Sequence, residues 1–319
     1  MKNAIKILGL GLVVLITIGV IALVIINAQD LPSYETELVE FQRSDKAEAI
    51  ERGQKLATML CANCHMDRST SKLTGQRMKD APSEFGEIYA PNITQDKTYG
   101  IGEWTDGEIV RLLRTGIKRD GQYAPPYMAK LPLMADEDID AIISFLRSDH
   151  PMVVAENKPD TPTKPSLLTK VLSRLAFKPF PMPEKPIPMP DTNNALQLGE
   201  YLAHNLECFS CHSADFKTNN YLNPTMSPGY FAGGNQPLDL EGRVMLTPNL
   251  TPDEATGIGS WTKEQFTNAV KYGLKEGEPP LSYPMLPYTQ LTDYEVGAIY
   301  DYLMTIPPIA NEVERSIYN

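Results

Sequence analysis

Residues 61–65 read Cys-Ala-Asn-Cys-His and residues 208–212 read Cys-Phe-Ser-Cys-His, and these two stretches contain every cysteine of the 319-residue chain. Two thiols at this spacing lie on one turn, where they can add to the two vinyl groups of one porphyrin. The histidine that follows can then reach the porphyrin iron from the same side. The stretches therefore predict two covalently attached c-type haems. The predicted attachment and proximal iron-binding residues are Cys61, Cys64, His65, Cys208, Cys211 and His212.

Other uses of paired cysteines fit this chain less well. A Cys-x-x-Cys pair also occurs in zinc sites and in redox dithiols. A four-cysteine zinc site would have to join two pairs that lie far apart in the sequence, and both adjacent histidines would have no role. A disulfide framework is typical of small secreted domains rather than of a chain of this length. Haem attachment is the interpretation that uses all six side chains.

Residues 1–30 are predicted to be an N-terminal transmembrane anchor. Residues 7–26 carry no charge and are mostly Leu, Ile, Val and Gly, which is the length and composition of a membrane-spanning helix. Lys2 and Lys6 precede this stretch and no Lys or Arg follows before Arg43, so the positive-inside rule places the rest of the chain outside the cytoplasm. The alternative is a cleaved signal peptide, but residues 25–29 offer no convincing Ala-x-Ala cleavage site. We therefore expect a single-pass protein of the bacterial inner membrane with its haem domains in the periplasm.

The exported part of the chain is acidic. The whole sequence has a formal net charge of −11, and the exported part is more negative because two of the 29 basic residues precede the apolar stretch. This balance argues against nucleic acid and anionic lipid headgroups as partners. It suits a basic patch on a protein partner, although solubility alone would explain it equally well.

The chain repeats itself at an offset of 157 residues. Residues 91–94 (PNIT), 100–105 (GIGEWT) and 116–118 (GIK) return as residues 248–251 (PNLT), 257–262 (GIGSWT) and 273–275 (GLK). The cysteines repeat at 147, so the second copy holds ten extra residues, most of them expected in the loop-like stretch 218–242. A repeat of this length is too long for a solenoid unit and indicates a duplicated domain. We expect haem domains over residues 31–150 and 191–319, joined by a Pro-rich linker over residues 151–190.

Each copy is predicted to be a set of helices joined by long loops, which makes the fold class all-α. Capping boxes at residues 105–108, 262–265 and 292–295 mark helix starts, and Gly116 and Gly273 mark helix ends. In the first copy Ala135 replaces the capping Thr, so Asp136 is the expected cap. Further helices are expected over residues 45–60 and 194–206, leading into the haem motifs, and over residues 166–177 in the linker. This last, basic helix would contact lipid or a partner, or pack across the two domains, which is the favoured alternative.

The repeat also selects the second axial ligand of each iron. Met128 and Met285 are the methionines that recur at offset 157, each in a proline-bounded loop before the last helix of its copy. Such a loop can present a thioether to the far face of a porphyrin. Met134 is the rival in the first copy, but its counterpart at position 291 is Leu. Met128 and Met285 are therefore the predicted distal iron ligands.

The two histidines outside the haem motifs are predicted to be surface residues. His150 ends the first copy and has Pro307 as its counterpart. His204 lies four residues before Cys208 on the leading helix, so it cannot easily cross to the distal face of its own haem. Ligation of iron by one of these histidines across the two domains is the remaining alternative.

Both tryptophans of the chain, Trp104 and Trp261, are repeat partners and are predicted to contact the haems. A buried indole N–H needs a partner, which a haem propionate would supply, although plain packing explains the pair equally well. Arg52, Arg111 and Arg114 are further candidates for pairing with propionates, and the sequence does not choose among them.

These motifs together resemble class I cytochrome c domains, and more closely the multi-haem cytochrome c subunits of bacterial membrane-bound alcohol and gluconate dehydrogenases. The resemblance covers both copies and implies His65 and His212 as proximal ligands and Met128 and Met285 as distal ligands. Those subunits commonly have three haem domains and often a C-terminal membrane anchor, whereas this chain has two haem motifs and an N-terminal apolar segment.

The leading hypothesis is an electron-transfer protein of a respiratory chain with no catalytic site of its own. It would pass electrons between a quinol-oxidising or dehydrogenase component and an oxidase or soluble carrier. The alternative from a different class is a di-haem peroxidase or other haem-based oxidoreductase, which needs one open iron; two equivalent methionines argue against it. A third hypothesis is the two-haem entry subunit of a haem–copper oxidase, which differs from the first only in its partner.

Overall fold

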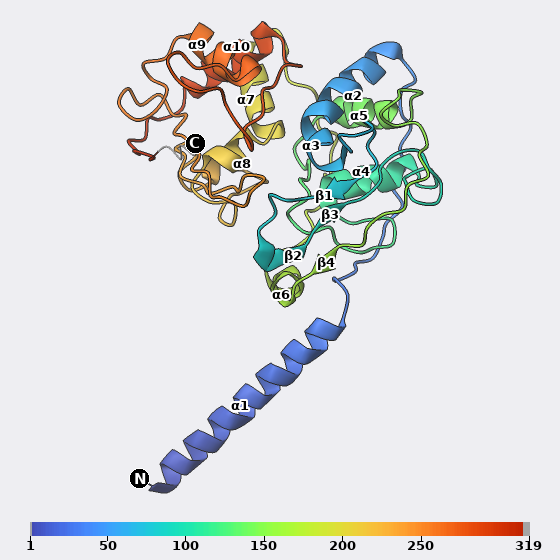
Figure 1. Cartoon of the computed structure of the whole chain (residues 1–319), viewed down its shortest axis with the longest axis vertical. Coiled ribbons are helices and arrows are strands. Elements are labelled where there is room, and N and C mark those ends of the chain that lie inside the picture. Colours follow the sequence, from blue (N-terminus) through green and yellow to red (C-terminus); the bar gives the residue numbers. More distant parts are fainter. Residues whose placement is uncertain (1, 315–319) are drawn as a thin grey trace.

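The computed structural model describes residues 2–314 and places two helical units side by side, with one long helix projecting from them (Figure 1). The first unit is built on helices α2 (Ala47–Leu60), α3 (Ala62–His65), α4 (Asp106–Thr115) and α5 (Asp136–Leu146). The second unit is built on α7 (Ala195–Asn205), α8 (Cys208–His212), α9 (Lys263–Tyr272) and α10 (Asp293–Leu303). The remaining helices are α1 (Lys2–Ala28), α6 (Leu167–Leu175) and the short 3-10 helices η1 (Ser83–Phe85) and η2 (Pro224–Met226).

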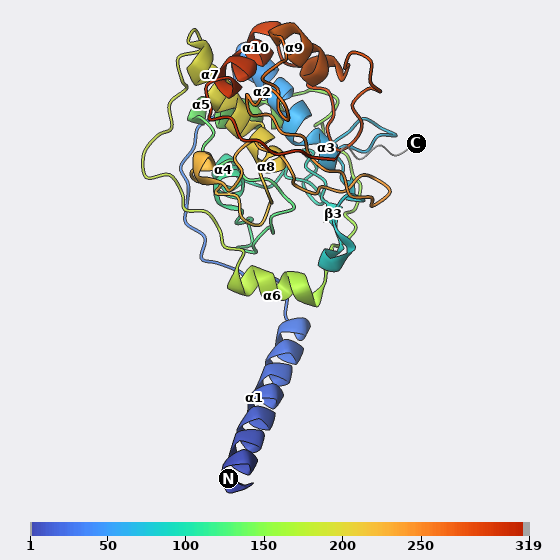
Figure 2. The same ribbon diagram turned by 90° about the vertical axis from the view of Figure 1, so that its left-hand side faces the viewer.

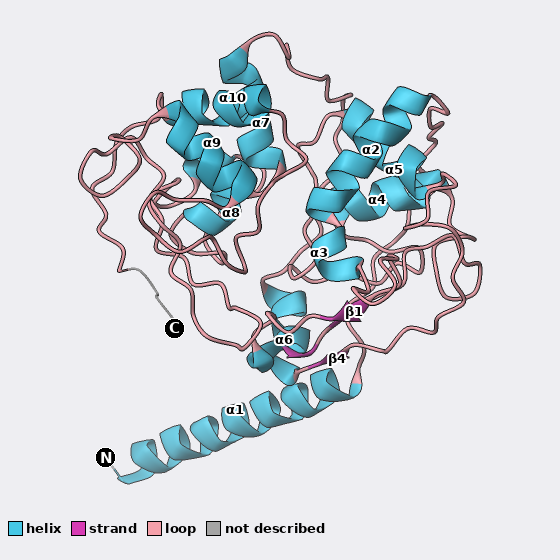
Figure 3. Cartoon of the chain, turned by 45° about the horizontal axis from the view of Figure 1, so that its top comes forward, coloured by secondary structure: helices cyan, strands magenta, loops and turns pink. Residues whose placement is uncertain are grey.

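The chain is mostly helix and loop (Figure 3). An all-α fold was expected from the sequence, but the structure also contains short strands. β1 (Gln76–Arg77) pairs antiparallel with β3 (Tyr89–Ala90), and β2 (Gly86–Glu87) pairs antiparallel with β4 (Lys164–Pro165). Strands of two residues are too short to show an alternating pattern, which is why the sequence gives no sign of them.

The predicted helix caps are confirmed with one exception. Thr105, Thr262 and Thr292 each form a complete capping box with the residue three positions later. Gly116 and Gly273 end α4 and α9 in the left-handed conformation, with φ of 83° and 71°. The prediction that Asp136 caps α5 is wrong: Ala135 is the N-cap and makes no side-chain capping bond. The Asp136 carboxylate instead accepts hydrogen bonds from Arg114 and from the backbone of Ile187.

In each unit the first and last helices cross in direct backbone contact at a glycine. A Cβ on Gly53 of α2 would lie 1.8 Å from the Ala141 carbonyl oxygen of α5, and a Cβ on Gly199 of α7 would lie 2.0 Å from that of Ala298 in α10. No residue with a side chain fits such a crossing, so these glycines set the distance between the helices. The crossing brings buried apolar side chains of both helices together, including Phe145 in the first unit.

The loops of the two units repeat the same hydrogen bonds. The amide of Ile101 donates to the carbonyl of Thr94 at 2.8 Å, and that of Ile258 donates to Thr251 at 2.9 Å. The turns that carry the predicted distal methionines are also tied back in the same way, because the amide of Leu131 donates to Leu113 and that of Tyr288 donates to Val270. The sequence repeat therefore corresponds to a repeat of local geometry.

The segment predicted as a linker, residues 151–190, runs along the first unit. Val153 is buried, and the carbonyls of Glu156 and Lys158 accept hydrogen bonds from the Asn92 side chain. In the second unit Asn249 makes the matching bond to the carbonyl of Ile309, near the end of the described chain. In both units, residues that follow the last helix therefore pack onto the loop that contains Asn92 or Asn249.

α1 projects away from the two units as a single helix (Figure 1). Its segment Ile5–Ala28 is long and apolar enough to cross a membrane, and none of its most apolar stretch is buried in the structure. α6 lies across the end of α1 that meets the two units (Figure 2). It packs against η1 of the first unit, where the Thr169 hydroxyl donates to the carbonyl of Phe85 at 2.8 Å. The favoured prediction that α6 packs across the two domains is therefore replaced by a contact with the first unit and α1.

Candidate functional site

The first Cys-x-x-Cys-His motif forms one helical turn with its histidine held in a defined orientation. Cys61 ends α2 and opens α3, and both thiols of the motif are free and partly exposed. The His65 ring is 8% exposed, and its Nδ1 lies 2.8 Å from the carbonyl oxygen of Pro91. A carbonyl only accepts, so Nδ1 carries the proton and the lone pair of Nε2 is left for a metal ion.

The second motif repeats this arrangement. α8 carries both thiols and His212, whose ring is 6% exposed and whose Nδ1 lies 3.0 Å from the carbonyl oxygen of Pro248. A backbone carbonyl that accepts from the other ring nitrogen commonly fixes the tautomer and orientation of a histidine that binds a metal ion. The same partner for His65 and for His212 shows that both rings are prepared for the same role.

The Pro-Asn-x-Thr loops hold these carbonyls in place. The Asn92 side-chain oxygen accepts from the amide of Thr94 at 2.9 Å and from its hydroxyl at 2.8 Å, and Asn249 makes both bonds to Thr251 at the same distances. Both asparagines are buried. The recurrence of Pro-Asn-x-Thr in the sequence therefore has a structural cause: it builds the loop that orients the histidine.

The protonation states of both motifs suit haem attachment. Burial lowers the pKa of His65 and of His212, and the proline carbonyls offset this only in part, so both rings are neutral as a metal ligand must be. Burial raises the pKa of the Cys61 and Cys208 thiols to about 12. These thiols are therefore protonated at neutral pH while no metal ion is bound to them.

The zinc alternative also fails on geometry. Across residues 2–314 no three His, Cys, Asp or Glu side chains converge in a way that would hold a metal ion. The two cysteine pairs lie in different units, on α3 and α8, and each pair keeps its own histidine. The residues present fit two separate haem sites, each with two thiols on one turn and an imidazole whose Nε2 is available.

The predicted distal methionines lie in matching turns. Met128 is half-buried, and its amide donates to the carbonyl of Pro125 at 3.1 Å; Met285 is half-buried at the same point of the second loop. The Met128 side chain packs against the edge of the apolar core. Met134 is fully buried, so its role is packing. Complete burial therefore distinguishes Met134 from the half-buried Met128 and Met285. Iron ligation by Met128 and Met285 stays a prediction.

The predicted tryptophan and arginine contacts are resolved in part. Trp104 and Trp261 are both half-buried against the core, and their contact with haem stays a prediction. Arg114 is committed elsewhere, because its guanidinium donates to the carbonyl of Leu131 and to Asp136. The remaining two candidates also have protein partners: Arg52 pairs with Asp138, and Arg111 donates to the carbonyls of Glu37 and Lys118.

The prediction that His150 and His204 are surface residues is wrong, because both are half-buried. His150 packs on Phe145, with ring centres 5.2 Å apart. His204 lies among aromatic rings, and its Nε2 is 2.5 Å from the hydroxyl of Tyr230. Both histidines therefore have places in the protein, which weakens the alternative of iron ligation across the units.

The turn that precedes Met285 contacts the first unit. Tyr283, two residues before Met285, donates a hydrogen bond from its hydroxyl to Asp80 of the first unit. Burial raises the pKa of Tyr283, and the charges of Asp80 and Cys64 raise this pKa further. The sequence repeat does not reveal this contact, because the residue equivalent to Tyr283 is Pro126.

A longer-range interaction between the units involves the opposite charges of Lys130, two residues after Met128, and Glu207, which directly precedes Cys208. Burial lowers the pKa of Lys130 to about 7 and raises that of Glu207 to about 7. The negative charge of Glu207 partly offsets the shift in Lys130, and the positive charge of Lys130 partly offsets the shift in Glu207. Residues 56–60 match residues 202–206 without a gap, so Glu207 is one extra residue before the second haem motif, and its φ of 62° is left-handed. Lys130 and Glu207 therefore interact electrostatically between the units.

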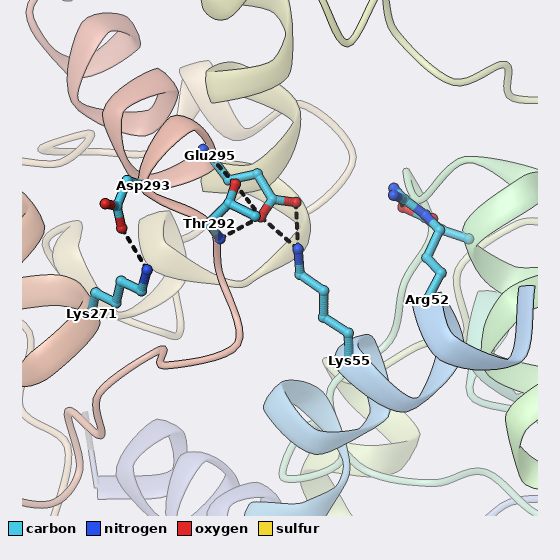
Figure 4. A network of polar contacts seen from close by, with 7 residues as sticks. Arg52, Lys55, Lys271, Thr292, Asp293 and Glu295 are labelled. Carbon is cyan, nitrogen blue, oxygen red and sulfur yellow. Dashed lines mark hydrogen bonds and ion pairs between the residues drawn. The ribbon is translucent and has the colours of Figure 1, made fainter. Parts of the chain in front are cut away.

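Two further polar contacts fasten the units together. The Lys55 ammonium of α2 lies 2.5 Å from the Glu295 carboxylate of α10, which also caps α10 through Thr292 (Figure 4). Asp138 is fully buried and is bound from both sides, by Arg52 of its own unit and by the Tyr201 hydroxyl of the other at 2.5 Å. These contacts could not be predicted from the sequence repeat, because the repeat identifies only the features that the two copies share and not the contacts between them.

The Cytochrome c family model matches residues 50–149 and 196–307, more than half of the chain, and the chain belongs to this family. The family implies covalently bound haem c and electron transport.

Curated relatives carry more specific names. The chain is 27% identical over 286 residues to the alcohol dehydrogenase (quinone) cytochrome c subunit of Gluconacetobacter polyoxogenes, covering 86% of this chain and 59% of that protein. It is 30% identical over 275 residues to the fructose dehydrogenase cytochrome subunit of Gluconobacter japonicus, covering 81% and 53%. It is 26% identical over 257 residues to a diheme cytochrome c-type protein of Cereibacter sphaeroides, covering 78% and 82%. The chain thus spans little more than half the length of the first two relatives.

Proposed function

We propose that the chain is a membrane-anchored di-haem cytochrome c that transfers electrons on the periplasmic side of a bacterial respiratory chain. The observation that carries the proposal is the matched pair of histidines. His65 and His212 each follow two thiols on one turn, and each has Nδ1 bound to a proline carbonyl, at 2.8 Å and 3.0 Å. Two sites built to the same plan are best explained by two haems of the same kind, in tandem duplicated domains.

The roles of the side chains follow from this arrangement. A bound haem c would supply a one-electron couple at each site. Cys61 and Cys64 would fix one porphyrin to α3, and Cys208 and Cys211 would fix the other to α8. Met128 and Met285 would close the remaining axial positions, which excludes substrate and favours electron transfer over catalysis. Trp104 and Trp261 would pack at the edge of each cofactor.

The location is inferred from α1 and the charges before it. Segment Ile5–Ala28 is long enough to span a bilayer, and none of its most apolar stretch is buried in the structure. Lys2 and Lys6 precede the uncharged stretch 7–26 of this segment, and the next basic residue is Arg43, which favours a cytoplasmic N-terminus and periplasmic haem units. An anchored carrier would meet its partners by lateral diffusion at the membrane surface.

The proposed electron donor is a membrane-bound dehydrogenase or another quinol-oxidising component, and the acceptor is an oxidase or a soluble carrier. Support for a dehydrogenase comes from relatives that are named as cytochrome subunits of alcohol and fructose dehydrogenases. The net charge of −11 favours a partner with a basic docking patch.

Purification of the full chain from its native membranes in mild detergent tests this proposal. We expect two covalent haems per chain, a co-purifying dehydrogenase, and reduction of the haems when the substrate of that dehydrogenase is added. A variant with Cys208→Ala and Cys211→Ala should retain one haem, which calibrates the haem count. One haem per wild-type chain, or peroxide turnover at an open haem, would contradict the proposal.

A further inference from the structure

The faces of helix α6 are reversed relative to those of an ordinary surface helix. Thr169 and Ser173, one turn apart, are 1% and 0% exposed and face the first unit, whereas Leu168 and Leu175 are 45% and 75% exposed. At 100° per residue, Leu167, Leu168, Val171 and Leu175 form a stripe on the side opposite the two buried polar residues. A water-exposed helix normally buries its leucines and exposes its polar side chains. The exposed stripe therefore needs an apolar neighbour.

Basic residues flank this stripe. Lys170, Arg174 and Lys178 lie on or just after α6, and within the described part of the chain none of the three forms an ion pair with a carboxylate. Their charge contrasts with the net charge of −11 of the whole chain. The overall acidity argues against anionic headgroups as a partner, but α6 is a local exception to it.

The position of α6 identifies the neighbour. The Lys170 ammonium donates to the carbonyl of Asn27 at 2.6 Å, and the Arg174 guanidinium donates to the carbonyl of Asp30 at 2.6 Å. These carbonyls lie at the end of the apolar segment Ile5–Ala28 and just after it. Figure 2 shows α6 lying across that end of α1, between α1 and the two units. Because Thr169 bonds to Phe85 of the first unit, the leucine stripe on the opposite side of α6 faces away from that unit.

We infer that α6 is an interfacial helix that lies on the membrane surface, with its leucines among the acyl chains and its cations among anionic lipid phosphates. A basic amphipathic helix with Leu on one face is the kind that lies in the plane of a bilayer interface. The inference rests on the proposed anchoring by α1, because α6 is then held at the depth where the span leaves the hydrocarbon. It goes further in assigning an orientation: α6 and α1 together fix the first haem unit against the bilayer.

Hydrogen exchange of the full, haem-loaded chain in lipid nanodiscs tests the inference. We expect the amides of α6 to exchange about tenfold more slowly in nanodiscs that contain phosphatidylglycerol than in the same protein in non-ionic detergent, with a smaller effect in phosphatidylcholine alone. Leu168→Glu should abolish this protection. Leu222→Glu is the matched control, because Leu222 has the same exposure of 45% but lies in a loop of the second unit.

Three outcomes would overturn the inference: equal exchange in lipid and detergent, equal loss in both variants, or protection that arises only when a purified partner protein is added. The last result would make the leucine stripe a protein docking surface instead. Haem content and reduction by the donor are measured on the same samples and should be unchanged in Leu168→Glu. Loss of the anchor itself is recognised separately, since the wild-type chain would then be released from membranes by alkaline washing.

Discussion

The hydroxyl of Tyr283 in the second unit donates a hydrogen bond to the Asp80 carboxylate in the first. This bond joins the turn of Met285, the predicted distal ligand of one haem, to the unit of Cys64, which is predicted to attach the other haem. The contact means that the two predicted haem sites are not independent. A change at one site has a direct mechanical route to the other.

Tyr283→Phe removes the donor of this bond while keeping the ring. Because a bond to a carboxylate is involved, we expect a coupling free energy of about 1.5–3 kcal/mol between Tyr283→Phe and Asp80→Asn in a double-mutant cycle of unfolding. Electron equilibration between the two haems should slow at unchanged haem content. Tyr294→Phe is the control, since its exposed hydroxyl bonds to Thr192 within its own unit. Additive effects of the first two changes would show that the bond does not join the units.

The Lys55–Glu295 ion pair should contribute about 1 kcal/mol to the contact between the units, because neither side chain is more than a quarter exposed. Glu295→Gln removes the charge but keeps the capping box, as Gln265 does in α9. The control is Asp293→Asn, which breaks the neighbouring ion pair with Lys271 within the second unit (Figure 4). Asp293 is 75% exposed, so its loss should have little effect. Denaturant unfolding and small-angle scattering of the two variants measure the difference.

This ion pair also predicts a pH dependence. Burial opposes ionisation of Glu295, but hydrogen bonds from Lys55 and Thr292 outweigh it, so the folded pKa lies below the ordinary 4.5. A lowered carboxyl pKa stabilises the folded state above the unfolded pKa, and this contribution is lost as the pH falls through the folded value. We expect acid to weaken the contact of the units in the wild type and to have less effect in Glu295→Gln. An identical acid response in both proteins would exclude this pair as the cause.

Gly53→Ala and Gly199→Ala should each destabilise their own unit. The added Cβ would lie 1.8 Å and 2.0 Å from carbonyl oxygens of the crossing helix, so the helices must separate. We expect a loss of about 1–3 kcal/mol in each case, as for other overpacked cores. Gly297→Ala provides the comparison: its Cβ would meet only the flexible Lys263 side chain at 3.2 Å, and alanine favours the helix. Thermal unfolding should show Gly53→Ala and Gly199→Ala to be less stable than Gly297→Ala. Equal stability of all three variants would refute the close crossing of the helices.

His204 should make the second unit sensitive to mild acid. Burial lowers its pKa to about 4, whereas an unfolded histidine has the ordinary value of 6.5. Since the folded pKa is depressed, the stability that neutral His204 provides is complete above pH 6.5 and is lost as the pH falls toward 4, up to about 3 kcal/mol in all. Unfolding measured over this range should depend less on pH in His204→Gln. A variant with the same pH profile as the wild type would assign the effect to another group.

The sequence predicts the parts of this protein that each copy repeats. The residue types and spacing of Thr262 and Gln265 predict a capping box. The pair Asn249 and Thr251 recurs in the sequence because the loop that orients His212 needs both residues. Gly53 and Gly199 could have been recognised as a pair, because they hold equivalent places before the two haem motifs. An isolated glycine in a helix, however, does not indicate which helix crosses it. The contacts between the units could not be predicted. Glu207 is an insertion and Tyr283 replaces a proline, so both lie where the copies differ.

The proposal of two closed haems is tested most directly by the sulfur-to-iron charge-transfer band of the fully oxidised protein, measured per haem together with the high-spin signal. The wild type should show the band at the intensity of two methionine-ligated haems and no high-spin component. Met128→Ala and Met285→Ala should each lose half of the band, whereas Met134→Leu, a change in the packed core, should keep all of it. A wild-type protein with one high-spin, five-coordinate haem, or a band that keeps its full intensity in Met128→Ala or Met285→Ala, would contradict the account.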